Sequence, residues 1–507
     1  MELYNYHKKL YNNISNLLIY IKNKYLFNIL LINQKIFFTL FTPLLYLYSK
    51  KKKKKDNVYF ISNEEHLKKT EKIRNKIIAK SQNKNCKIFT SRNVKEQISS
   101  RVSNAKNNGS KVNTEDLNKI IYIDYEKEMI KLEPRVSMKN ISDIILDNGY
   151  TLPVIPELDD LTVGGLLMGC GIESSSFKYG LFQDICIEYE IITASGNVLN
   201  VNKSNDPELF YSLPWSYGTL GILVSATLKM IKIPSKYIEL TYKRTNPIDL
   251  QYNLKKLCST NIDFIEAITY SKNLSIIIYG NYVIDCKNIV ISKISKWNSQ
   301  WYYKFVEKVD DNFRHTITLK EYYHRHSKSI FWELKYLQPF GNAFIFRNLL
   351  GWANPPDISV IKKCQPKWLL KYYSNNHVVQ DYLIPLDKMN HFTSVCNKEL
   401  NVYPIWICPY KIIGNDYLGL MSKKKSELYV DIGYYGLSKN KSFEMENSIT
   451  KIEDLVIDLN GYIMLYAYNK LTKDKLQKMF DFNLYTNQRK KLKADNIFPE
   501  IYDKIIN

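Results

Sequence analysis

The 507-residue chain has no closely spaced pair of cysteines. Its eight cysteines show neither a CxxC nor a CxxxC spacing, so the sequence supports neither a zinc site nor a disulfide framework. His324 and His326 form an i, i+2 pair without a third ligand nearby, so no metal site is predicted. The scattered cysteines fit a reducing, cytosol-facing compartment best. They are Cys86, Cys170, Cys186, Cys258, Cys286, Cys364, Cys396 and Cys408.

Acidic residues are nearly missing from the first 60 residues. That stretch holds eleven lysines against Glu2 and Asp56, which places +9 of the formal net charge of +22 there. In the rest of the chain, basic side chains are interleaved with carboxylates, so a basic groove for nucleic acid is not predicted. The basic N-terminal stretch instead favours contact with a membrane surface.

Charge is also missing from residues 26–48, apart from Lys35. The run is long enough to span a bilayer, too long for the apolar part of a signal peptide, and no small-residue cleavage site follows it. A helix lying on the membrane surface is the alternative, because Asn28, Asn33, Gln34 and Lys35 form a polar notch. Four lysines precede the run and six follow it directly, so the positive-inside rule places the remaining chain on the cytosolic side.

Glycine is concentrated in residues 161–180, which hold five glycines and three consecutive serines beside an apolar Leu-Leu-Met. We expect a loop whose backbone N–H groups at Gly164, Gly165, Gly169 and Gly171 approach an anion such as phosphate. An ordinary glycine-rich turn is the alternative interpretation. No GxGxxG sequence is present, which disfavours a doubly wound dinucleotide-binding fold.

The residues after this loop predict a hairpin over 181–201, with its turn at Ser195 and Gly196. Asp206 and Pro207 then begin a helix, and a Gly-x-x-Gly turn leads into an apolar strand. This order resembles the FAD-binding domain of the vanillyl-alcohol oxidase superfamily. The resemblance implies an α+β fold in which a two-subdomain FAD-binding domain carries an α+β substrate cap with an antiparallel sheet.

Four longer strings are similar to one family within that superfamily, the delta-24 sterol reductases or diminuto family. They lie at residues 150–165, 322–334, 377–381 and 402–409, and the resemblance extends over about 57–506. It implies an FAD-dependent oxidoreductase that acts on a CH–CH group, with NADPH as reductant and the side-chain double bond of a sterol as substrate. It also implies an N-terminal transmembrane helix in the endoplasmic reticulum membrane.

These observations divide the chain into six predicted parts. They are an N-terminal tail (1–25), a transmembrane anchor (26–48), a basic linker (49–57), the FAD-binding domain (58–235), the substrate cap domain (236–455) and a C-terminal segment that returns to the FAD-binding domain (456–507).

The expected FAD is noncovalent. Members of the superfamily usually carry a second glycine-rich loop whose histidine bonds the flavin, but residues 90–101 hold neither a glycine cluster nor a histidine. Arg92 and Arg101 are candidates for replacing the lost donors, although solvated surface residues are the simpler interpretation. The resemblance places the cofactor along Thr162, Val163, Gly164, Gly165, Leu166, Leu167, Met168, Gly169, Cys170, Gly171, Ile172, Glu173 and Ser174.

Reduction of an isolated alkene requires a hydride, one proton donor and an apolar site that excludes water. Tyr466, on a strand expected to return to the FAD-binding domain, and His326 are the candidate proton donors. Arg325 or His326 is expected to supply a cation that stabilises the phenolate of Tyr466. A role in packing is the alternative for each of these residues.

Two other functions fit parts of the sequence. One is an FAD-dependent oxidase or dehydrogenase of an alcohol or lactone, although such enzymes usually carry the histidine loop that is absent here. The other is a catalytically decayed membrane protein that binds a sterol or a protein partner, which would be expected to lose the glycines that this chain retains.

Overall fold

The structure of the protein is a computed structural model. It describes residues 31–32, 35–37, 40–44, 46–47, 59–82, 87–90, 109–284, 290–353, 372–373, 375–413, 419–422 and 428–505. Residues 91–108, which contain Arg92 and Arg101, lie outside this set.

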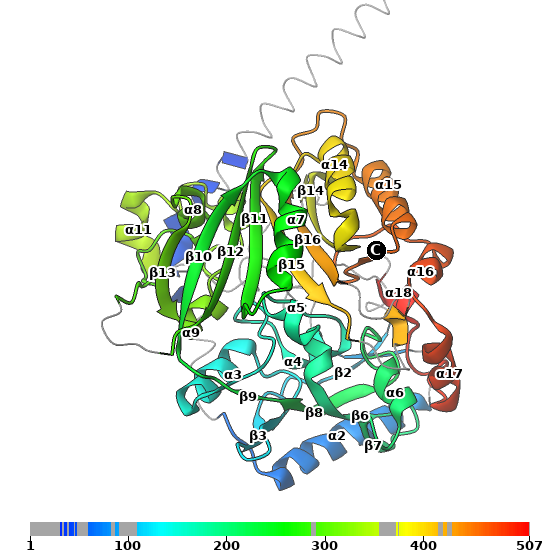
Figure 1. Ribbon diagram of the computed structural model, residues 1–507. Helices are drawn as coiled ribbons and strands as arrows, with labels where there is room; N and C mark the ends of the chain where they lie inside the picture. The colour runs from blue at the N-terminus through cyan, green and yellow to red at the C-terminus, as the bar shows by residue number, and fades with distance from the viewer. Residues whose placement is uncertain are drawn as a thin grey trace, which may run out of the picture.

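The first domain is built on a five-stranded antiparallel sheet (Figure 1). The predicted hairpin forms, and β8 lies between it and a second strand pair and pairs with one strand of each. In sheet order the strands are β3 (Ile120–Asp124), β4 (Met129–Leu132), β8 (Ile222–Lys229), β6 (Cys186–Ile192) and β7 (Val198–Asn202).

Side-chain caps begin two helices of this domain, one of them at Asp206 as the sequence predicts. Ser137 accepts a hydrogen bond from the N–H of Asn140 at the start of α3 (Met138–Ile145), and Asp206 accepts one from Leu209 at the start of α6 (Pro207–Ser212). The other elements are α2 (Asn63–Ser81), α4 (Val163–Met168), α5 (Ser176–Tyr179), the parallel pair β1 (Ile88–Thr90) and β2 (Ser110–Val112), and the antiparallel pair β5 (Tyr150–Thr151) and β9 (Ile231–Lys232).

The second domain is built on an eight-stranded sheet whose paired neighbours all run antiparallel. Three of its strands lie largely within the apolar-rich stretches 262–270, 274–283 and 428–433. In sheet order the strands are β13 (Phe313–Thr318), β10 (Tyr237–Thr245), β12 (Leu274–Tyr282), β11 (Phe264–Ser271), β15 (Ile405–Lys411), β16 (Leu428–Leu437), β14 (His377–Pro385) and β17 (Tyr462–Ile463).

The two faces of this sheet have different neighbours. Helices α7 (Pro247–Cys258), α14 (Met389–Glu399) and α15 (Met445–Asp458) cover one face (Figure 1), where Tyr382 packs on Phe392. The other face lies against the first domain, with α5 on β15. Smaller helices at one edge of the domain are α8 (Tyr302–Lys308), α9 (Leu319–Tyr323), α10 (Leu334–Leu337) and α11 (Phe344–Leu350).

The C-terminal segment contacts both domains. β17 still pairs with β14 of the large sheet, whereas α17 (Asn483–Lys491) packs on α6 of the first domain, where Gln488 donates to Glu208 over 2.9 Å. Helices α16 (Lys473–Met479) and α18 (Ile501–Ile505) complete this segment.

Only part of the predicted transmembrane anchor is described. Residues 31–32, 35–37, 40–44 and 46–47 are helical, and the other residues of 26–48 lie outside the described set, as do the predicted tail 1–25 and linker 49–57. Among the residues that the structure describes, no helix has both the length and the apolar character needed to span a bilayer.

Candidate active site

The first half of the glycine segment is a helix, which corrects the prediction of a loop. Residues 163–168 form α4, with Thr162 as its N-cap. The N–H groups of Val163 and Gly164 donate to the carbonyl oxygens of Val136 and Pro134 over 3.1 and 2.8 Å. The N–H of Gly169 donates to Gly165. The backbone donors of Gly164 and Gly169, which we expected to face an anion, are therefore used within the protein.

Three of these glycines are required by packing. A Cβ at Gly164 would lie 2.6 Å from Cβ of Pro134, one at Gly169 would lie 2.7 Å from the Gly165 oxygen, and one at Gly171 would lie 2.8 Å from Leu166. Gly165 differs, because its Cβ would meet only Oγ1 of Thr162, at 3.3 Å, and the residue is exposed. Its φ is not positive, so backbone strain does not explain the glycine either.

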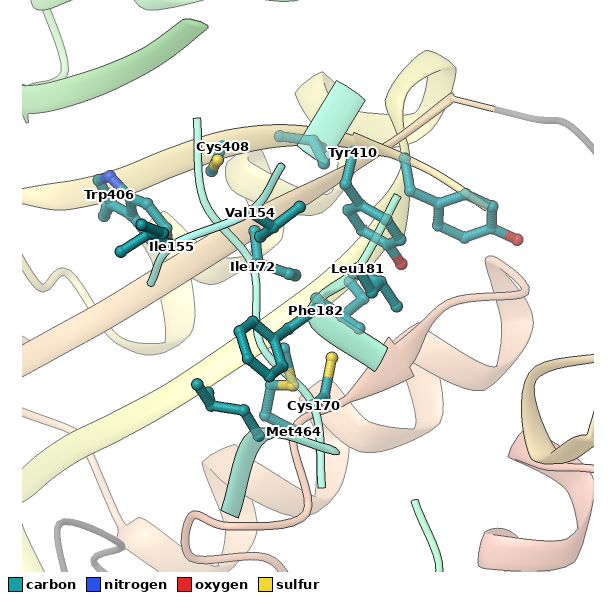
Figure 2. Packing of buried hydrophobic residues seen from close by; sticks show 14 of the residues in the cluster. Val154, Ile155, Cys170, Ile172, Leu181, Phe182, Trp406, Cys408, Tyr410 and Met464 are labelled. Carbon is teal, nitrogen blue, oxygen red and sulfur yellow. The ribbon is translucent and has the colours of Figure 1, made fainter. Parts of the chain in front are cut away.

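The second half of the segment lies between the two domains. Val163, Leu166, Leu167, Met168 and Ile172 are buried in the core. Figure 2 shows Cys170, Ile172 and Phe182 in one buried cluster with Trp406, Cys408 and Tyr410 of β15, and the carbonyl of Ser174 accepts a hydrogen bond from the N–H of Ile265 in β11. The segment thus forms one wall of an apolar junction between the domains.

A buried ion cluster joins the domains beside this segment. Arg325 donates through Nη2 to Glu173 and through Nε to Glu266, each over 2.6 Å. Glu266 also accepts from Nε1 of Trp406 over 2.8 Å. Burial alone would raise the pKa of Glu266, but Arg325 and His326 lower it to well below its usual range. Glu173, which the sequence assigned to the cofactor, is therefore also held by a cation of the second domain.

His326 is a core residue of this cluster. Its Nε2 lies 3.1 Å from Oε2 of Glu266, its ring stacks on Phe331 with centroids 4.4 Å apart, and it has no exposed surface. Burial lowers the pKa of His326 despite the neighbouring Glu266. His326 is thus packed within the buried cluster, against Glu266 and Phe331.

Tyr466 belongs to a second cluster, centred on Asp381. It lies in a turn after β17 and not on the predicted strand, and the N–H of Met464 fixes this turn by donating to the Asp381 carbonyl over 3.0 Å. The hydroxyl of Tyr466 donates to Oδ2 of Asp381, and the hydroxyl of Tyr435 donates to Oδ1. We expected a cation beside the Tyr466 hydroxyl, but the group that lies there is the carboxylate of Asp381.

Burial and neighbouring carboxylates shift the pKa values of this cluster upward. Burial raises the pKa of Asp381 to about 6, although the two tyrosine hydrogen bonds oppose this shift. Burial and then repulsion by Asp381 raise the pKa of Asp431 well above its usual range, and burial and then repulsion by Glu173 raise the pKa of Glu157 in the same way. The pKa of Tyr466 is raised by burial and then by Asp381, so its phenol stays protonated.

The sheet register brings this cluster onto the face that meets the first domain. Gly433 pairs with both Asp381 and Trp406, and Asp431 pairs with Cys408, so these side chains share one face. A Cβ at Gly433 would lie 2.4 Å from the Tyr435 hydroxyl and 2.6 Å from Oδ1 of Asp381. The glycine therefore leaves the space in which Tyr435 and Asp381 meet.

Five residues of these two clusters are not predicted from the sequence: Asp381, Asp431, Glu266, Tyr435 and Gly433. A signal was present, because each of the three acids stands alone in a strand whose other residues are almost all uncharged, as in His-Val-Val-Gln-Asp-Tyr-Leu-Ile-Pro. A single acid within a buried strand marks a position with a special partner. In the described part of the chain, no group of three or more His, Cys, Asp or Glu side chains is arranged to hold a metal ion.

Comparison with known proteins identifies the family. A family model described as an FAD binding domain matches residues 82–202. The delta(24)-sterol reductase homolog dhcr-24 of Caenorhabditis elegans is 40% identical over 424 residues, which cover 79% of each chain. The delta(24)-sterol reductases of Mus musculus and Homo sapiens are 41% and 39% identical, with 76% of each chain covered. The chain therefore belongs to the delta(24)-sterol reductase family of FAD-dependent oxidoreductases.

Proposed function

We propose that this protein reduces the C24 side-chain double bond of a sterol, with noncovalent FAD and with NADPH as reductant. The first domain is then an FAD-binding domain of the vanillyl-alcohol oxidase type, and the second is its substrate cap. Residues 26–48 anchor the chain in the endoplasmic reticulum membrane, with the catalytic domains on the cytosolic side. The observation that carries the reaction is the hydrogen-bonded group Tyr466, Asp381 and Tyr435 at the apolar junction of the two domains.

The residues at this junction fit FAD in two respects. Gly165 is exposed on α4, where a side chain would meet almost no protein atoms. The absence of a side chain at this position therefore leaves room for a bound ligand. Oε2 of Glu173 and the hydroxyl of Tyr410 are buried and have no hydrogen-bond partner among the described residues. Buried polar atoms without partners are costly, and a bound polar ring system would supply the missing bonds.

Bound FAD would supply the hydride. The protein must then hold the sterol away from water and deliver one proton. Cys170, Ile172, Trp406 and Cys408 provide an apolar surface from which water is excluded. Tyr466 is partly exposed, unlike the fully buried His326, so its hydroxyl is the better placed of the two candidate donors.

Asp381 determines whether Tyr466 can release its proton. An ionised Asp381 accepts the hydroxyl hydrogen of Tyr466 and holds it. A protonated Asp381 can donate to the phenol oxygen instead, which turns the tyrosine hydrogen toward a substrate and replaces it after transfer. In the proposed mechanism Tyr466 is the proton donor and Asp381 supplies the replacement proton.

The reaction is tested by mixing the purified full-length protein with NADPH in the absence of oxygen. The flavin absorbance should bleach, and a sterol with an unsaturated side chain should restore it while the same sterol with a saturated side chain should not. Bleaching that neither sterol reverses would reject the sterol reductase assignment and favour another acceptor.

Gly165→Val should remove FAD from the purified protein without unfolding it. Valine would fill the space in front of α4, whereas the protein itself offers no clash except with Oγ1 of Thr162. Gly165→Ala is the matched variant, because glycine within a helix is about 0.8–1 kcal/mol less favourable than alanine. We expect Gly165→Ala to keep or raise the melting temperature and still bind less FAD. Unchanged flavin content in both variants would show that the cofactor does not contact α4.

The sterol-dependent step should slow as the pH rises through about 6, the pKa of Asp381. The pKa is raised, so Asp381 is protonated below this value and can resupply Tyr466 there, whereas it is ionised above it. Flavin reoxidation by sterol, measured after reduction of the enzyme at each pH, should therefore fall above pH 6. Asp381→Asn should flatten this dependence, and a fall that persists in Asp381→Asn would assign it to another group.

A further inference from the structure

Large apolar side chains are exposed together on one edge of the second domain. Helix α11 buries Phe346 but leaves Phe344 73% exposed, Ile345 72% and Leu349 66%. Phe340, Trp352 and Trp297 are exposed next to them, and Arg347 of α11 donates to the carbonyl of Asn298 over 2.6 Å, which holds the Trp297 segment against the helix. We call Trp297, Phe340, Phe344, Ile345, Leu349 and Trp352 the α11 face.

The two segments that form the α11 face contain no acidic residue. Residues 290–300 carry Lys293 and Lys296, and residues 334–353 carry Lys335 and Arg347. Lys293 and Lys296 are exposed, whereas Lys335 and Arg347 are partly buried. An apolar surface with exposed tryptophans and neighbouring lysines has the composition of a protein surface that enters the headgroup region of an anionic bilayer.

The helical residues near the N-terminus rest on the same edge. Gln338, next to α10, donates to Oγ1 of the buried Thr42, and the rings of Tyr46 and Trp352 lie edge to face with centroids 5.8 Å apart. Ile36, Leu40, Leu44 and Leu47 of that N-terminal stretch are exposed. Figure 1 shows these residues, in dark blue, beside the part of the domain that carries α8 and α11. The exposed apolar surface is thus continuous between the N-terminal residues and the α11 face.

We propose that the α11 face docks on the surface of an anionic lipid bilayer and gives the second domain its own membrane contact. The proposed anchoring of residues 26–48 is used here only to orient the second domain relative to the membrane. The docked face lies in the domain proposed to cover the substrate, so a sterol would reach that domain from the bilayer and not from water.

The test uses the full-length protein and vesicles of phosphatidylcholine and phosphatidylserine that contain a phospholipid with a photoreactive acyl chain. After illumination, labelled peptides are identified by mass spectrometry. Peptides that span 340–352 should be labelled on the order of tenfold more than the peptide of α7, since burial of even one large apolar side chain in lipid favours contact by about that factor. Helix α7 is the internal reference, because Ile248 and Tyr252 are also exposed there.

Substitutions separate the α11 face from the anchor. Phe344→Ser, Ile345→Ser and Leu349→Ser combined should abolish labelling of 340–352 and leave labelling of 26–48 unchanged, whereas Ile248→Ser with Tyr252→Ser should change neither. Vesicles without phosphatidylserine should label 340–352 less, because the exposed Lys293 and Lys296 lose their anionic partners.

Two outcomes would overturn the proposal. Labelling confined to 26–48 would show that the anchor holds the chain while the α11 face stays in water. A chemical crosslink between the α11 faces of two chains, formed without vesicles, would show that a second copy covers it. Neither outcome depends on turnover, so failure of the proposed reaction and failure of this membrane contact are distinguishable.

Discussion

Arg325→Met should lower the free energy of unfolding by about 3–5 kcal/mol, because removal of one partner from a buried ion cluster leaves its counter-charges unpaired. Arg325 is completely buried and donates to Glu173 of the first domain and Glu266 of the second. Methionine has a similar length but no donor, so both carboxylates would lose their cation. Chemical denaturation of the purified protein, followed by circular dichroism, measures the loss.

Lys178→Met is the matched control for this prediction. Lys178 also pairs across the domain junction, with Asp263 over 2.9 Å, but this pair is partly exposed, with 37% and 22% of the side chains accessible. Solvent screens such a pair, so we expect a loss below about 1 kcal/mol. Equal losses in the free energy of unfolding of Arg325→Met and Lys178→Met would mean that burial does not determine how much these ion pairs stabilise the protein. Addition of Glu173→Gln and Glu266→Gln to Arg325→Met should restore part of the stability.

Tyr466→Phe should slow flavin reoxidation by sterol by roughly 10²-fold or more, the usual effect of removing a general acid. Flavin content and bleaching by NADPH should stay unchanged, since only the sterol-dependent step consumes this proton. Rapid mixing of the reduced protein with sterol measures that step alone. The substitution removes the hydroxyl that donates to Asp381 and retains the ring.

His326→Ala distinguishes the two candidate donors named from the sequence. His326 is buried against Glu266 and Phe331, so its loss should lower stability, while reoxidation per bound flavin stays near that of the parent protein. If sterol reoxidises the flavin of Tyr466→Phe at the parent rate but that of His326→Ala slowly, the histidine is the proton donor. If sterol reoxidises the flavin of both variants at the parent rate, neither residue supplies the proton.

Much of the first domain could be predicted because its signals are local. Ser137 and Asp206 cap the helices that follow them, and Gly196 adopts a positive φ at the turn that joins β6 to β7. Each signal depends on hydrogen bonds within a few residues, so neighbouring residues suffice to interpret it. The family resemblance was likewise carried by continuous strings.

Helix α4 was missed because tertiary packing outweighs its local preference. Consecutive glycines disfavour a helix, and the sequence therefore predicts a loop. In the folded protein Gly164 lies against Pro134, whose carbonyl accepts the Gly164 N–H, and this contact requires a residue without a side chain. The partner stands 30 positions earlier in the chain, beyond the reach of a local rule.

The chain's own sequence determined the FAD-dependent family, the order of elements and the candidate Tyr466. Only the tertiary structure decided which charge lies beside that tyrosine. Antiparallel pairing of β14 with β16 brings Asp381 next to Gly433 and Tyr435, and the turn after β17 adds Tyr466. Arg325, expected there as a cation, is bound by two other carboxylates instead. Register between distant strands sets these contacts, and no spacing within one segment encodes that register.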